Sequence, residues 1–347
     1  MDNYIEKKLK TEKVKCITVF TALFIMIVIV GLTSVCMGAM DIKISDVFNV
    51  MASKIFGTET DVADNIFSVI WNIRLPRIIC ACFVGMGLAV SGAIFQSILQ
   101  NPLADPYTIG ISTGASFGAS AAITVNLIFG IYFPIIPIAL IGAFVTLITV
   151  ILIARKGNSF DSSNIIIAGI IVSSVLSSGI GFMKILAGEN VGAIVFWIMG
   201  SLSAKGWSDV FISAPVCVIL TMISVFFARR LDIMALGDES ARGLGVNANR
   251  VRFLYLTAGS VIIAVCVSVC GVIGFVGLIV PHLIRFWITA RNRVLIPLSA
   301  LFGSLLLMTA DTFARLIFSG EIPVGILTTL IGGPFFIFVF IKKRGAN

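Results

Sequence analysis

The sequence predicts an all-α polytopic membrane protein with about ten transmembrane helices and both termini in the cytoplasm. Hydrophobic residues fill 58% of the 347 positions and the mean hydropathy is +1.09, which excludes an ordinary soluble domain, whose apolar share is about half. Long apolar runs such as 16–38 and 165–183 do not alternate in polarity, so they favour helices over the strands of a membrane barrel. A crossing needs roughly 20 apolar residues, and the runs indicate spans near 16–38, 76–99, 108–129, 133–154, 164–186, 209–228, 252–270, 273–290, 294–318 and 322–341.

The distribution of lysine and arginine sets the orientation of these spans. With the N-terminus inside, 18 of the 25 basic residues fall on the cytoplasmic side. This bias follows the positive-inside rule. The net charge of +8 therefore reflects membrane topology and does not indicate a nucleic-acid partner.

Two connections on the outer side are longer than the rest. The first, 41–75, is polar, and the second, 188–207, contains the apolar run VGAIVFWIMGSL. That run is too short to cross a membrane, so it predicts a short helix at the outer surface or re-entering the membrane. Spans two to five and seven to ten then form two sets of four, a division that suggests an internal repeat of the kind found in transporters. The sequence itself leaves the repeat open, because little besides two helix-breaking pairs, Asn101-Pro102 and Pro281-His282, aligns.

A polar island interrupts the apolar chain at 229–252. Eight of its 24 residues are charged, and five of these are arginines, which places it on the cytoplasmic face. Asp238 is expected to cap a short helix over 239–242, and Gly245 to end it in the left-handed conformation. A compact charged knob of this kind is what a soluble partner would bind.

The stretch QSILQNPLADPYTIGISTGASFGAS at 96–120 is the second unusual segment. Asn101, Pro102, Asp105 and Pro106 break the helix at the end of a span. Broken backbone at membrane depth is tolerated only where it is buried in protein or lines a watery cavity. Two interpretations follow: a tight cytoplasmic loop, or a reoriented helix start that lines or gates a pathway.

Small residues recur at four-residue spacing after this break. Gly110, Gly114 and Gly118 lie on one helix face, and such rows let helix backbones approach closely. Most of these positions are explained by packing inside the bundle, but Gly110 and Gly114 are also candidates for the path or gate.

Nothing in the sequence predicts covalent chemistry. No GxxxxGK[ST] phosphate loop and no plausible Ser-His-Asp triad is found, and no cofactor or metal site is predicted. The seven cysteines lie in or beside apolar spans, where packing is their expected role. Asp311 and Arg315 are four residues apart near the outer end of a span, a spacing that favours an ion pair.

Five segments in order resemble one family across about 270 residues. The chain is similar to the permease subunits of binding-protein-dependent ABC importers for iron–siderophore complexes, haem and cobalamin. The matching segments are RLPR (74–77), SGAIFQSILQNPLADPYTIGISTGA (91–115), LGDESARGLGVNANRVR (236–252), GFVGLIVPHLIR (274–285), and ADTFAR (310–315) with EIPVGILTTLIGGPFFI (321–337).

The resemblance implies one transmembrane domain over 1–347, with ten spans, in the inner membrane of a bacterial cell. It implies a second permease subunit, identical or homologous, two cytoplasmic ATPase subunits and an extracytoplasmic binding protein. The island then corresponds to the coupling helices that dock into the ATPases. Their usual sequence pattern is EAA---G, and Glu239-Ser240-Ala241 with Gly245 is similar to it, with Ser240 in place of one alanine. The residues implied for coupling are Gly237, Asp238, Glu239, Ser240, Ala241, Arg242 and Gly245. Those implied for docking of the binding protein are Arg74, Arg77 and Arg315.

The expected function is therefore a non-catalytic permease subunit, with ATP hydrolysed by separate subunits, that forms the path for an iron chelate. Haem or cobalamin is the alternative cargo. An ion-coupled secondary transporter is a remote alternative, because the spans carry almost no ionisable residues away from their ends and that class gives the cytoplasmic knob no role.

Overall fold

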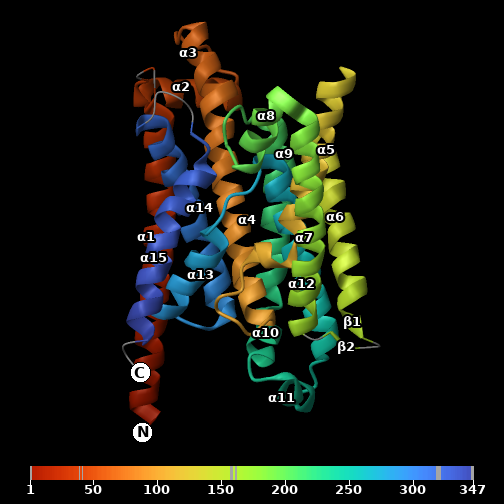
Figure 1. Cartoon of the computed structure of the whole chain (residues 1–347). Coiled ribbons are helices and arrows are strands. Elements are labelled where there is room, and N and C mark those ends of the chain that lie inside the picture. Colours follow the sequence, from red (N-terminus) through yellow and green to blue (C-terminus); the bar gives the residue numbers. More distant parts are fainter. Residues whose placement is uncertain are drawn as a thin grey trace.

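The computed structural model describes residues 2–38, 40, 42–156, 159–160, 162–317 and 322–344. Helices make up nearly all of this part of the chain and form one elongated bundle (Figure 1). Eight of the helices are long and apolar enough to cross a membrane. Their candidate spans are Glu12–Cys36, Asp64–Ile98, Ile111–Phe129, Ile135–Ala154, Ser163–Ile198, Trp207–Phe226, Ala248–Cys270 and Asn292–Ile317.

Each predicted span corresponds to one helix, so the all-α polytopic class is confirmed. The helices, in the order of the ten predicted spans, are α1 (Asp2–Cys36), α4 (Leu75–Ile98), α5 (Ile111–Phe129), α6 (Ile135–Ala154), α7 (Ser162–Ala187), α9 (Trp207–Phe226), α12 (Ala248–Cys270), α13 (Val276–Trp287), α14 (Asn292–Ile317) and α15 (Val324–Arg344). Between α6 and α7 lie two strands of two residues each, β1 (Arg155–Lys156) and β2 (Ser159–Phe160), which pair antiparallel. Glu321, within one of the segments that carry the resemblance, lies outside the described residues.

The eighth predicted span, 273–290, is only partly helical. Residues 271–275 are not helical, and α13 begins at Val276. Its 12 residues rise only about 18 Å, too little for a hydrocarbon core of about 30 Å. Phe275 at the helix start has a left-handed φ of 68°, which turns the chain into the helix.

Shorter elements occupy the two ends of the bundle. At the outer end are α2 (Ile44–Phe56), α3 (Asp64–Ser68), the π-helix η1 (Val69–Arg74), the 3-10 turn η3 (Gly188–Asn190) and α8 (Val191–Ile198). At the opposite end are α10 (Ala228–Met234) and α11 (Asp238–Gly243), the end at which α1 starts and α15 finishes (Figure 1). The remaining 3-10 turn, η2 (Pro106–Ile109), lies between α4 and α5.

The π-helix has a simple cause in the sequence. Pro76 follows it at the start of α4 and has no N–H to donate to the residue four positions earlier. The Leu75 N–H bonds instead to the Ile70 carbonyl, five residues back. The helix therefore widens for one turn without ending, and α3, η1 and α4 continue as one rod over Asp64–Ile98.

Helix α4 is the centre of the bundle and α1 lies at its edge. The apolar stretch of the α4 rod is 78% buried, against 6% for that of α1. Glycines allow this burial: Gly85 of α4 meets Gly303 of α14, and Gly92 meets Gly277 of α13, each with backbone against backbone. In lipid the hydrophobic effect does not drive helices together, so close backbone contact provides much of the attraction.

The packing supports an internal repeat of opposite orientation. Helices α4 and α12 contact each other and run in opposite directions (Figure 1). Helix α4 packs on α13 and α14 of the second half, and α12 packs reciprocally on α5 and α6 of the first. Each of the two is followed by a non-helical connection that turns back into the bundle. These contacts are compatible with the predicted repeat of spans two to five and seven to ten, in the inverted form known from transporters.

We expect Gly92→Ala to destabilise the protein strongly. A Cβ at this position would lie 1.8 Å from the Gly277 carbonyl oxygen, so α4 and α13 would have to separate. Overpacking of a tight core costs typically about 1–3 kcal/mol, and the melting temperature in detergent should fall accordingly. Gly181→Ala in α7 is the matched control, because nothing lies within 4 Å of its Cβ. Equal melting temperatures for the two variants would contradict this role of Gly92.

Candidate functional site

The cytoplasmic knob consists of α10 and α11, and glycines shape its turns. Gly237, with φ of 97°, precedes α11. Gly245 has φ of 77° and its N–H bonds to the Arg242 carbonyl, so the predicted left-handed end is confirmed. In most other residues a positive φ is strained, and these two glycines define how α11 projects from the bundle.

The prediction that Asp238 caps α11 is wrong. The helix starts at Asp238 itself, with Gly237 in the cap position and no side-chain cap. The Asp238 carboxylate instead accepts a bond of 2.8 Å from the guanidinium of Arg252, which is buried at the start of α12. A partly buried ion partner outcompetes the local cap, and the pair fastens α11 to α12.

Helix α11 divides into a packed side and an exposed side. Ala241 is fully buried against the bundle. The exposed residues of the knob and its turns are Arg229, Arg230, Ala235, Leu236, Glu239, Ser240, Arg242, Gly243, Leu244 and Gly245. Leu236 and Leu244 are both more than half exposed, so the surface combines apolar and charged groups, as a protein interface does.

A polar chain that sequence reasoning missed links the knob to the core. Asp232 of α10 accepts bonds from the backbone and side-chain N–H groups of Asn292, at 2.7 and 2.9 Å, at the start of α14. The Asn292 amide oxygen in turn accepts a bond of 2.6 Å from Ser97 of α4. Gln100 adds a second link, donating to the Met234 carbonyl of α10 at 2.7 Å.

Arg285 extends this chain to α13. Its guanidinium donates to the Ser97 hydroxyl at 2.7 Å and to the Gln96 side-chain oxygen at 3.2 Å. The Gln96 amide donates to the Leu278 carbonyl of α13. Gln96 and Ser97 are polar residues at the end of an apolar span, and this position was the only local signal that could have identified them.

The α4–α5 connection turns back into the bundle. It begins at the inner end of α4, and Gly110 at its far end packs against Gly169 and Ser173 of α7. Asp105 caps η2 by accepting the Tyr107 N–H at 3.0 Å. Burial raises the pKa of the Asp105 carboxyl to about 6, against the lowering effect of this bond.

Tyr107 joins this connection to the other non-helical segment, 271–275. Its hydroxyl donates to the backbone carbonyl of Ile273. Away from water, backbone groups outside helices need such partners. The two non-helical segments that follow α4 and α12 therefore contact each other inside the subunit.

The residues predicted to line or gate the path fall into two groups. Asn101 and Pro102 are exposed in the turn after α4, and Asp105 with the backbone of Pro106 starts η2. Gly110 and Gly114 are different. A Cβ on either would lie 2.6 Å or less from a side-chain oxygen of α7 or α6. Both glycines thus pack against helices of the same subunit, and their role beside the path stays a prediction.

The outer arginines are buried where the sequence predicted exposed charges. Arg77, 6% exposed, donates to both carboxylate oxygens of Asp311 at 2.9 to 3.2 Å. Arg315 forms the expected pair with Asp311, at 3.5 Å, and donates to the Ser34 hydroxyl at 2.6 Å. This ion cluster joins α1, α4 and α14.

Arg74 is also satisfied within the subunit. Also 6% exposed, it donates to the carbonyls of Val35, Cys36 and Met40 at 2.6 to 3.0 Å. Arg74 therefore fixes the C-terminal end of α1 and the residues that follow it. The guanidinium groups of Arg74 and Arg77 thus bond to the bundle itself, and their role in docking stays a prediction.

Comparison with known proteins identifies the family. The FecCD transport family matches residues 25–342. The chain belongs to this family. The hemin transport system permease protein HmuU of Yersinia pestis is 36% identical over 332 residues, which cover 93% of this chain and 95% of that protein. The cobalamin import system permease protein BtuC of Halobacterium salinarum is 40% identical over 276 residues, 80% of this chain and 74% of that protein.

A solved structure agrees with the FecCD assignment. An inward-facing metal-chelate type ABC transporter superimposes with a TM-score of 0.82 at 30% identity, over 94% of this chain and 99% of the other. The chain is thus the permease subunit of an ABC importer, a multi-pass inner-membrane protein of a family that works with ATPase and binding-protein partners. The secondary-transporter alternative is excluded by this membership.

We expect Asp311→Asn to destabilise this FecCD permease by about 3–5 kcal/mol, the usual cost of breaking a buried ion pair, because Arg77 keeps its charge but loses its counter-ion. Melting temperature in detergent is the measurement, and Asp64→Asn at the exposed start of α3 is the control. Replacing both partners, Arg77→Met with Asp311→Leu, should recover part of the loss. A melting temperature of Asp311→Asn equal to that of the control would refute the ion-cluster role.

Proposed function

We propose that this permease forms the path for an iron chelate of the siderophore class. The observation that supports this proposal is that relatives of the chain are named for the import of iron complexes. Besides the hemin permease, the permease of a Fe(3+)-citrate import system of Bacillus subtilis is 36% identical over 78% of this chain. Ferric citrate and haem are both iron complexes that arrive with their own ligands. Cobalamin is the second candidate, favoured by the 40% identity to the cobalamin permease.

We propose further that the knob is the surface on which the ATPases act. The residues proposed for coupling are Gly237, Asp238, Glu239, Ser240, Ala241, Arg242 and Gly245, of which the buried Ala241 supports the surface from below. The support is mechanical: the Asp238–Arg252 pair fixes α11 to α12, and Asp232 and Gln100 fix α10 to α14 and α4. A push on the exposed side of α11 would therefore move several spanning helices together. ATP hydrolysis itself belongs to the two separate ATPase subunits.

The path is proposed to lie between this subunit and a second permease subunit, identical or homologous. Asn101, Pro102, Asp105 and Pro106 are the residues of this chain proposed to gate it at the cytoplasmic side. Support comes from the break in α4–α5, which provides a non-helical segment that can rearrange more easily than a spanning helix.

The binding protein is proposed to dock at the outer ends of α1, α4 and α14. Arg74, Arg77 and Arg315 carry three positive charges near this end of the bundle. Buried charge still contributes to the field outside the molecule and steers an acidic partner to the site. The arginines would then act through this field more than through direct contact.

We expect Glu239→Arg to leave the permease folded and to weaken ATPase binding on the order of tenfold at low salt, because a rim charge is reversed. Glu189→Arg, an equal reversal at the exposed outer end, is the control. Co-purification of the ATPases and a titration of their affinity measure the effect. Normal affinity in Glu239→Arg would refute the coupling role.

Gly245→Val should also weaken coupling, since the φ of 77° at this position is strained for a β-branched residue.

The cargo is tested with the complete transporter in liposomes with its cognate binding protein. We expect uptake of a radiolabelled ferric siderophore or ferric citrate complex that requires ATP. Uptake confined to haem or to cobalamin would reject the iron-chelate assignment but retain the permease.

A further inference from the structure

The outer segment between α1 and the α4 rod contains an amphipathic helix, α2, with three distinct faces. Val47 and Val50 are fully buried and fix the helix to the protein. Ile44, Phe48 and Ile55 are 53 to 62% exposed. Their spacing of four and eleven residues places them within about 40° of one another around the helix axis. An apolar stripe thus runs along α2, and each of its three side chains is more than half exposed.

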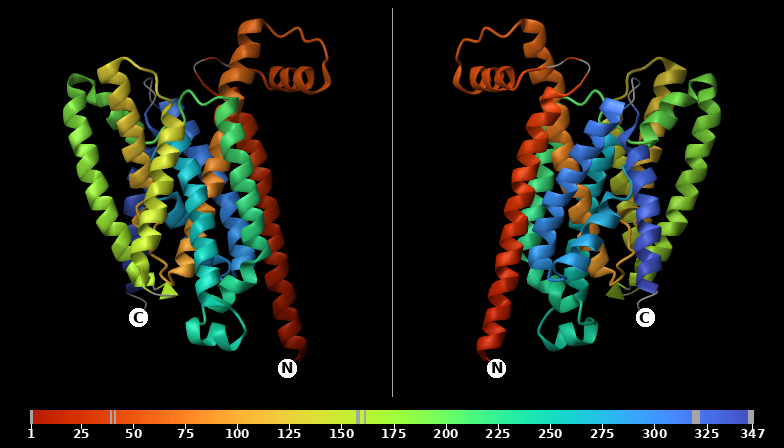
Figure 2. Two further views of the ribbon diagram at one scale, coloured as in Figure 1. Left: turned by 90° about the vertical axis from the view of Figure 1, so that its right-hand side faces the viewer. Right: turned by 90° about the vertical axis from the view of Figure 1, so that its left-hand side faces the viewer.

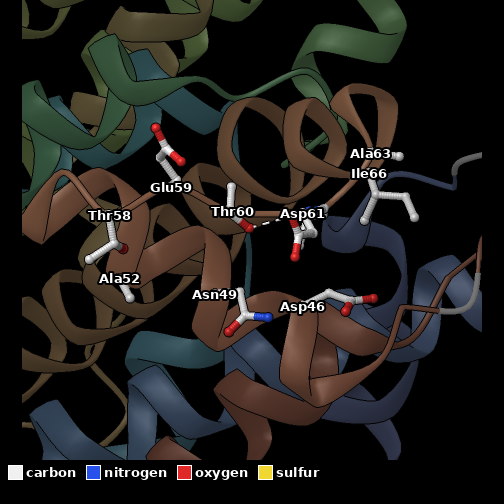
Figure 3. A pocket seen from close by; sticks show the side chains of 10 residues that line it. Asp46, Asn49, Ala52, Thr58, Glu59, Thr60, Asp61, Ala63 and Ile66 are labelled. Carbon is white, nitrogen blue, oxygen red and sulfur yellow. Dashed lines mark hydrogen bonds between the residues drawn. The ribbon is translucent and has the colours of Figure 1, made fainter.

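The polar face of α2 lies on another side. Asp46 and Asn49 line a hollow of about 590 Å³ beneath the 57–63 loop, together with Glu59 and Asp61 (Figure 3). Asn49 directly follows Phe48, but a helix turns each residue by about 100°. One face of α2 therefore suits water, and the neighbouring face does not.

The position of α2 matches the surface of a bilayer. Figure 2 shows it lying across the direction of the spanning helices, level with their outer ends and projecting beyond α1. Helix α1, beside it, is the least buried of the eight candidate spans, with 6% of its apolar stretch buried. The apolar stripe of α2 therefore continues the lipid-facing surface of α1.

Aromatic and basic residues mark the same level. Trp71 and Trp207, at the outer ends of two spans, pack with ring centroids 4.9 Å apart, and tryptophan is typical of the headgroup region. The Lys54 ammonium of α2 lies 6.0 Å from the centre of the Trp71 ring. Lys43 precedes α2 and is exposed. Lysines that flank an apolar stripe suit anionic headgroups.

We propose that α2 is an interfacial anchor that inserts Ile44, Phe48 and Ile55 into the outer leaflet of the membrane. An amphipathic helix of this kind sinks about 5–10 Å into the boundary between headgroups and acyl chains. The anchor holds the outer segment flat beside α1 and keeps its acidic hollow turned to water. The occupant of the stripe is lipid, and not a second permease subunit or the binding protein.

The test places a photoreactive benzoylphenylalanine at Phe48 or, as matched control, at Asn49. The complete transporter, with its ATPases and binding protein, is assembled in nanodiscs of phosphatidylethanolamine and phosphatidylglycerol, irradiated and analysed by mass spectrometry. The expected result is a phospholipid adduct at position 48 and none at position 49. An adduct at position 48 to a permease subunit or to the binding protein, equal lipid adducts at both positions, or none at either, would overturn the proposal.

A second measurement needs no photoreactive group. In the same nanodiscs, Phe48→Asp with Ile44→Asp should release α2 from the membrane and speed tryptic cleavage after Lys54. Asn49→Asp with Ser45→Asp adds the same charge away from the apolar stripe and should cleave like the unmodified protein. Equal cleavage of the two double variants would count against the anchor.

Discussion

The backbone contact between α4 and α14 is the constraint on which the rest of this permease depends. Gly85 and Gly303 approach so closely that a Cβ on either would lie within 2.4 Å of the other's carbonyl oxygen. This contact fixes the height of one helix against the other. At the outer end it brings Arg77 to Asp311, and at the inner end Ser97 to Asn292. Both polar clusters therefore depend on two glycines between them.

The inner cluster gives the knob a route into the core. Asp232, Asn292, Ser97 and Arg285 form a continuous chain of hydrogen bonds from α10 through α14 and α4 to α13. Each bond contributes modestly in itself, but a group left without its partner in this interior would be costly. The elements are thus expected to move as a unit, which is what a subunit driven by external ATPases requires.

Lipid explains where the irregular backbone lies. In a hydrocarbon environment unpaired N–H and C=O groups cost several kcal/mol each, so the breaks after α4 and α12 are found inside the bundle, where Tyr107 bridges them. The same cost keeps Arg74 and Arg77 turned inward to carbonyls and a carboxylate. Helix α1, at the edge of the fold, has few buried residues, and beside it the apolar stripe of α2 faces outward.

Much of the architecture could be predicted from the sequence because the deciding signals are local. The length of apolar runs sets the spans, the bias of lysine and arginine sets their direction, and a four-residue spacing correctly paired Asp311 with Arg315. Gly245 was predicted in the left-handed conformation for the same reason. Only the tertiary structure decided the rest. The main partner of Asp311 is Arg77, 234 positions away. Asp238 pairs with Arg252 and forms no local cap, and Gly114 packs against α6. These outcomes depend on which helix faces which. That choice is made by close packing between segments far apart in the chain, which no local pattern contains.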